Sequence, residues 1–337
     1  MTSTSSPSLP LSPRESDTLW SQRWCWMAAA GVVALVVVVW KAPFVGLAQA
    51  YNLGRLLLVA PFVLLPLGMS MLARSDRGGR HSLCFKAAFV WHPFALVGLV
   101  GALCLKAPVA PILAAMWLLQ TMLFAGFGLS RFAWHGFVAL EEVGLSMSLV
   151  YLPVGGAWLV VHTLGWTLGF SPIIVLLTVL HFHYAGFAAS FVTGMSGRVL
   201  PEQGQARRWY RFGGTLVVLC PLLVALGISF SPLLEVITAM LLACGMLVVA
   251  GLMVFVIVPS VSSWLAKGGM VVAALSLSVT MALAVTYALG EYLKADWISI
   301  ARMGQYHGLL NVLGYATCGI VAWFLVRPPS RFGREGR

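Results

Sequence analysis

Two histidines stand one residue apart in the long apolar segment "LTVLHFHYAGFAASFVTG", residues 177–194. Imidazole changes its charge near neutral pH, so His181 and His183 are candidates for proton transfer. Residues two apart on an α-helix are rotated by about 200°, so an ideal helix cannot present both rings to one metal ion. We expect one ring to face a cavity and the other to hydrogen-bond a neighbouring helix, or the helix to be locally unwound near Gly186. The alternative is a pair of neutral packing histidines.

A pair of carboxylates opens another apolar segment. Glu141 and Glu142 precede "VGLSMSLVYLPVGGAW". The alternatives are two solvated boundary carboxylates, or carboxylates inside the hydrocarbon zone that desolvation partly protonates. Pro153 and the following glycines predict a kink or a site of close helix approach. A kink would open space beside the histidines.

A third polar group lies in the last apolar segment, "YHGLLNVLGY". His307 and Asn311 are four residues apart and therefore share a helix face. Together with Tyr184, the two histidines and a glutamate, they form a plausible acid–base set. We predict that His181 or His183 shares one cavity with Asn311 and with Glu141 or Glu142, and that His307 caps that cavity. The alternative for His307 and Asn311 is an interfacial histidine and a helix-linking amide.

The elements that must position these residues are membrane spans. Hydrophobic residues make up 60% of the 337-residue chain and charged residues 9%, whereas a soluble domain carries about 25% charged residues. We predict an all-α bundle of ten transmembrane helices over residues 24–326. The expected spans are 24–40, 53–72, 86–105, 109–129, 143–166, 172–194, 212–230, 232–258, 268–290 and 306–326. Residues 1–23 are expected to form a disordered tail, and residues 327–337 a basic one.

The basic residues predict the orientation. With the N-terminus inside, the segments on the inner side hold 16 of the 21 lysines and arginines, which is the asymmetry of the positive-inside rule. We therefore expect a multi-pass protein of the cytoplasmic (inner) membrane with both termini in the cytoplasm. The net charge of +11 then reflects topology and contact with anionic lipids, and we expect no nucleic-acid partner. The motifs predict no metal site and no cofactor.

The segment "SPIIVLLTVLHFHYAGF", the glutamate pair with "YLPVGGAW" and the late "HGLLNVLGY" resemble the YndJ-like family of bacterial polytopic membrane proteins. The likeness covers residues 130–200 and the last span. It supports the membrane topology and the choice of site residues, and implies no particular reaction.

Three functions fit these observations. The first is a cofactor-independent acid–base enzyme, of isomerase or cyclase type, acting on a lipophilic small molecule; the sequence slightly favours it. The second is a proton-coupled secondary transporter or exporter, because ten spans with Gly- and Pro-interrupted helices fit that class. The third is a structural membrane protein without catalysis.

Overall fold

The computed structural model describes residues 13–46, 52–73 and 81–330. This part of the chain is helical and contains no strand. Ten of its helices are long and apolar enough to cross a membrane. They are Ser16–Lys41, Leu53–Leu72, Leu83–Cys104, Val109–His135, Leu140–Thr163, Pro172–Val199, Gln205–Phe230, Pro232–Ser260, Trp264–Leu293 and Ile300–Val326. Each overlaps one predicted span, so the predicted transmembrane helical bundle is confirmed.

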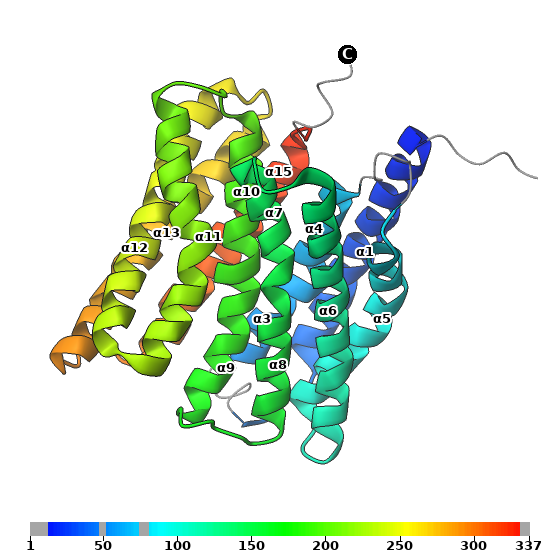
Figure 1. The fold of residues 1–337 in the computed structure, drawn as a ribbon. Coiled ribbons are helices and arrows are strands. Elements are labelled where there is room, and N and C mark those ends of the chain that lie inside the picture. Colours follow the sequence, from blue (N-terminus) through cyan, green and yellow to red (C-terminus); the bar gives the residue numbers. More distant parts are fainter. Residues whose placement is uncertain (1–12, 47–51, 74–80, 331–337) are drawn as a thin grey trace, which may run out of the picture.

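Several spans consist of more than one helical element, and Figure 1 shows their arrangement. The elements in chain order are α1 (Pro13–Lys41), α3 (Leu53–Val59), η1 (Ala60–Leu64), α4 (Leu65–Leu72), α5 (Leu83–Cys104), α6 (Val109–His135), α7 (Leu140–Val150), α8 (Leu152–Thr163), α9 (Pro172–His181), η2 (Phe182–Ala189), α10 (Ser190–Val199), α11 (Gln205–Phe230), α12 (Pro232–Leu252), η3 (Met253–Ile257), η4 (Val258–Ser260), α13 (Trp264–Leu293), α14 (Ile300–Arg302), η5 (Met303–His307), η6 (Leu310–Thr317) and α15 (Cys318–Val326).

The first helix begins earlier than the sequence predicts. Residues 13–23 were expected to belong to the disordered tail, but α1 starts at Pro13, where proline suits the first helical position. The ring of Trp20 packs edge-on against Phe85 and Phe89, with centroids 5.5 Å apart in both pairs. These aromatic contacts with α5 stabilise this part of α1, which the polar composition of residues 13–23 does not predict to be helical. Residues 1–12 lie outside the described part of the chain.

An even number of spans brings the two chain ends to the same side of the bundle. The start of α1 and the end of α15 lie at one end in Figure 1. We call this end the terminal side and the other end the opposite side. By chain order, the terminal side receives the end of α6, the start of α7, the end of α10 and the start of α11.

The second and sixth spans form the centre of the bundle. They are 72% and 67% buried, whereas the first span is only 17% buried and lies at the edge. The sixth span, made of α9, η2 and α10, packs against α8, α7, α3 and η6. Its polar residues are therefore placed between helices rather than against lipid on all sides.

Both central spans contain a stretch of π-helix, as does the last span. These stretches are η1, η2 and the pair η5 and η6, and η2 packs against both η1 and η6. Pro61 explains η1, because proline lacks the N–H that an α-helix needs at that point. Short π-helical segments are frequent at functional sites, so their meeting around η2 directs attention to this region.

Candidate functional site

Five buried charged residues form a cluster on the terminal side. They are Arg131, Glu141, Glu142, Arg198 and Arg207, each no more than 6% exposed. We call them the charge cluster. They come from four helices, α6, α7, α10 and α11, at the points where these spans end or begin.

Glu142 is held by two guanidinium groups at once. Arg131 donates from an Nη2–H to Oε2 at 2.6 Å. Arg198 donates from Nε to Oε1 at 2.8 Å and from Nη2 to Oε2 at 2.9 Å. The Arg198 contact is the two-pronged geometry that gives the strongest arginine–carboxylate pairs.

Glu141 forms a separate pair beside it. Arg207 donates from Nη2 to both carboxylate oxygens at 2.8 Å, and from Nη1 to the carbonyl of Gly197 at 3.1 Å. A third connection reaches the segment after α15, since Nη1 of Arg198 donates to the carbonyl of Pro328 at 3.3 Å. The cluster therefore joins four spans and Pro328, two residues after the end of the last span.

The surroundings of the glutamates differ from both sequence-based expectations. Neither carboxylate is solvated at the boundary: Arg131 and Arg198 pair with Glu142, and Arg207 pairs with Glu141. The three arginines were interpreted only as loop charges that set topology, whereas the structure places them inside helix ends. The signal in the sequence was that Arg131 and the two glutamates flank the short loop 136–139, whereas two further arginines, Arg198 and Arg207, flank the loop 200–204.

His183 lies in the middle of the bundle with both ring nitrogens occupied. Its Nδ1 lies 2.7 Å from the carbonyl of Val179 and must carry the hydrogen of that bond. Its Nε2 accepts from the indole N–H of Trp117 at 3.1 Å, and the two rings are stacked. This neutral histidine has no nitrogen left for proton transfer.

The fifth span approaches His183 closely instead of opening space beside it. The span breaks at Tyr151, between α7 and α8, near the predicted kink. A Cβ added to Gly155 would lie 2.8 Å from Nδ1 of His183. The predicted close approach is therefore present, and the space expected beside the histidines is filled.

The side chain of Tyr184, on the sixth span, forms hydrogen bonds with the backbone of the second span. Its hydroxyl donates to the carbonyl of Leu56 and accepts from the N–H of Ala60 at 3.3 Å. In an uninterrupted α-helix, that N–H would bond directly to that carbonyl. At the start of η1 the Tyr184 hydroxyl bridges this N–H and this carbonyl, and it thereby stabilises the interrupted helix. Both the donor and the acceptor of the hydroxyl are used in these two hydrogen bonds.

The two remaining histidines of the predicted set are His181 at the end of α9 and His307 at the end of η5, which we call the histidine pair. Nδ1 of His181 lies 2.8 Å from the carbonyl of Leu177, and Nδ1 of His307 lies 3.0 Å from the carbonyl of Thr280. Asn311 accepts from the Thr280 hydroxyl at 3.2 Å. His307 and Asn311 thus share a helix face, as predicted.

The structure does not bring the predicted residues into one cavity. Glu142 and Gly155 are separated by 13 residues of the fifth span, which corresponds to about 20 Å along the helix axis. Because Gly155 contacts His183, the glutamates and the histidines lie at different depths. The single-cavity prediction is wrong: the glutamates, the locked pair His183 and Tyr184, and the histidine pair with Asn311 are three separate groups.

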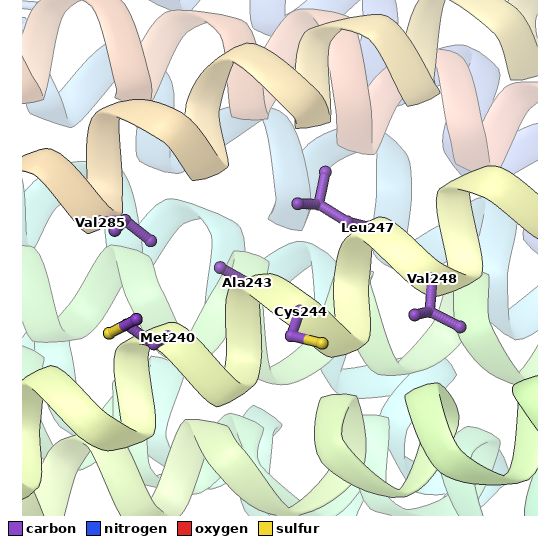
Figure 2. A pocket seen from close by; sticks show the side chains of 6 residues that line it. All are labelled: Met240, Ala243, Cys244, Leu247, Val248 and Val285. Carbon is purple, nitrogen blue, oxygen red and sulfur yellow. The ribbon is translucent and has the colours of Figure 1, made fainter.

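Two recesses lie elsewhere on the bundle. One, of about 490 Å³, is an apolar groove where α12 meets α13; Figure 2 shows its lining of Met240, Ala243, Cys244, Leu247, Val248 and Val285. The other, of about 360 Å³, lies on the terminal side between the ends of α10, the eighth span and α15. Neither is lined by a predicted site residue. In the part of the chain that the structure describes, no group of three histidine, cysteine or carboxylate side chains could hold a metal ion.

Comparison with known proteins identifies relatives without a known activity. The family model for YndJ-like proteins matches residues 55–315. The "Uncharacterized membrane protein YndJ" of Bacillus subtilis (strain 168) is 25% identical over 289 residues, which cover 84% of this chain and 50% of that protein. The chain thus spans about half the length of this relative. No solved structure matches.

Proposed function

We propose that this chain, which belongs to the YndJ-like family of membrane proteins, is a secondary transporter of a lipophilic or amphipathic small molecule. It is an integral membrane protein with ten candidate spans. In this proposal the charge cluster is the gate on the terminal side, where the cargo enters, and the cargo leaves past the histidine pair on the opposite side.

The charge cluster is the observation that carries the proposal. A buried ion pair contributes little net stability compared with apolar residues of the same volume, because desolvation offsets the attraction. Five buried charges at the ends of four spans are better explained by a contact that can form and separate. Alternating access requires such a contact at one end of the transport path.

The interrupted helices support the same function. Transporters use discontinuous helices near the middle of the membrane, where rigid segments meet and can move against each other. Here the second, sixth and last spans each contain a π-helical stretch, and η2 packs against η1 and η6.

The surroundings of the histidine pair favour an amphipathic cargo. His181 is exposed although its span is two-thirds buried, and His307 is partly exposed. The same side of α9 carries the partly exposed Ile174 and Leu177. An acid–base enzyme remains the second candidate, because the same pair could move a proton on such a molecule. The enzyme loses the support of a shared cavity with the glutamates.

The cytoplasmic membrane is the proposed location, with the terminal side in the cytoplasm. Three of the arginines counted on that side are buried in the charge cluster, which leaves 13 basic residues against five. The asymmetry therefore persists without the buried charges, as the positive-inside rule requires.

A charge exchange tests the gate. We expect Glu141→Arg or Arg207→Glu alone to abolish export, because each leaves two like charges buried together, and the double variant to restore part of it. The measurement compares small molecules in cells and medium for a deletion strain complemented with each variant. Glu202→Gln, in the exposed loop between α10 and α11, is the matched control and should behave as wild type.

The outcome separates the two functions. A compound that is retained unchanged inside deletion cells, and is released by the wild type and the double variant, supports transport. An accumulated precursor together with a missing product would support the enzyme instead and overturn the proposed transporter.

A further inference from the structure

We propose that η1 is a hinge in the second span, held in its π-helical form by two side chains from other spans. The side chains are Tyr184 of η2 and His92 of α5. Release of Tyr184 lets the second span return to continuous α-helical bonding. The hydrogen bonds of η1 follow from the geometry alone, whereas the use of the hinge in transport rests on the proposed function.

Two prolines remove the backbone donors that π-helical bonding of the second span needs. In a π-helix each carbonyl accepts from the N–H five residues later, and the N–H of Leu65 does donate to the carbonyl of Ala60. The same spacing pairs the carbonyl of Leu56 with residue 61, and the carbonyl of residue 61 with residue 66. Both Pro61 and Pro66 lack an N–H. Two carbonyls in the middle of the span therefore have no backbone donor in this form.

Two side chains supply the missing donors. The Tyr184 hydroxyl donates to the carbonyl of Leu56 and accepts from the N–H of Ala60. Nε2 of His92 lies 3.1 Å from the carbonyl of Pro61 and must carry the hydrogen of that bond, because a carbonyl only accepts. His92, Tyr184 and Pro61 are buried. Loss of either donor would therefore leave a carbonyl unsatisfied inside the bundle, which is costly.

Continuous α-helical bonding would need neither side chain. With a spacing of four residues, the carbonyl of Leu56 pairs with the N–H of Ala60. In the same way, the carbonyl of Pro61 pairs with the N–H of Leu65. Both N–H groups exist, but in the structure the first bonds to Tyr184 and the second to the carbonyl of Ala60. The two side chains therefore stabilise the π-helical form and not the α-helical one.

Each form leaves two carbonyls around the prolines without a backbone donor. In the α-helical form they are those of Leu57 and Phe62, four residues before each proline. In the π-helical form they are those of Leu56 and Pro61, which are the two that side chains of other spans reach. The balance between the forms thus depends on the neighbouring spans, as a hinge between moving parts requires.

The hinge lies where a movement of the sixth span can be passed to the opposite side. α3, the half of the second span before η1, packs against α9. A Cβ added to Gly308 in the last span would lie 3.4 Å from the side chain of Leu56. One added to Gly304 would lie 3.8 Å from that of Leu53. α3 therefore contacts both the sixth and the last span on the side where the proposed cargo leaves, and withdrawal of Tyr184 would loosen both contacts.

The first test restores the missing backbone donors and needs no cargo. We expect Tyr184→Phe and His92→Phe each to lower the thermal unfolding temperature of the full chain in detergent. Pro61→Ala supplies an N–H for Leu56, so it should recover part of the loss caused by Tyr184→Phe and none of that caused by His92→Phe. Pro66→Ala should do the reverse. Each loss is measured relative to the proline variant alone, as in a double-mutant cycle.

The pattern of rescue decides the assignment. Tyr292→Phe, at an exposed position near the end of α13, is the matched control and should unfold as wild type. A proline variant that rescues both substitutions equally, or losses that simply add in all four combinations, would overturn the proposed roles of Tyr184 and His92.

The second test observes the helical form directly. A cryo-electron microscopy structure of Tyr184→Phe in lipid nanodiscs, with a bound antibody fragment to add mass, should show the N–H of Ala60 bonded to the carbonyl of Leu56. It should also show no π-helical stretch over residues 60–64. A structure that keeps this stretch would overturn the hinge.

Export by the same variant tests the use of the hinge in transport. We expect Tyr184→Phe to lose export at an abundance that matches Tyr292→Phe. If export by the wild type is confirmed and the rescue pattern is absent, this inference fails alone. If the rescue pattern is found and the wild type exports no compound, the proposed function fails alone.

Discussion

At the scale of residues, the two histidines of "HFHY" have different surroundings, so their substitution by alanine should have different effects. His183→Ala removes the acceptor for the buried indole N–H of Trp117, and an unsatisfied buried donor costs about 1–3 kcal/mol. We expect lower thermal stability in detergent and reduced membrane abundance. His181→Ala should leave both near wild type while it abolishes function, because the ring is exposed and bonds only within its own helix. Unfolding curves with matched abundance measurements check this. Equal, mild effects from both substitutions would support the view that both histidines only pack.

At the scale of elements, the contact between α8 and the sixth span depends on Gly155. A methyl group there would lie 2.8 Å from the His183 ring and 3.1 Å from the carbonyl of Val179. We expect Gly155→Ala to destabilise the fold by about 1–3 kcal/mol, as overpacking does. Gly251→Ala is the control, because nothing lies within 4 Å of its added Cβ. Thermal unfolding of the two variants side by side measures the difference, and equal midpoints would contradict the close packing.

The helices themselves were largely predictable from the sequence, because apolar length and turn residues are local signals. The breaks at Lys106–Pro108 and before Pro232 are present, and the Ser231 hydroxyl caps α12 by accepting from Leu234 N–H at 3.4 Å. Ser171 also stands directly before a proline at the start of a helix, α9, but its side chain makes no such bond. The insertion of Tyr184 between Leu56 and Ala60 depends on contacts more than 120 positions apart in the chain. Periodicity carries no information about such contacts, and for the same reason the pairing of Arg207 with Glu141 was missed.

At the scale of the whole molecule, the side on which the ends lie decides the direction of the proposed gate. We expect reporter fusions at the C-terminus to read cytoplasmic and a fusion near Ala295, in the loop between α13 and α14, to read external, because the basic residues concentrate on the terminal side. Paired phosphatase and fluorescent-protein reporters give opposite signals at the two positions. A C-terminal fusion that reads external would reverse the orientation and place the charge cluster on the outer face.

The hydrogen bond from Arg198 to the carbonyl of Pro328 has a mechanical consequence. The same guanidinium holds Glu142, so the exit of the last span is fastened to the ion pair itself. In the proposed function, a movement of Arg198 away from Glu142 also disturbs its hydrogen bond to Pro328. The segment that follows α15 is therefore coupled to the proposed gate through Arg198.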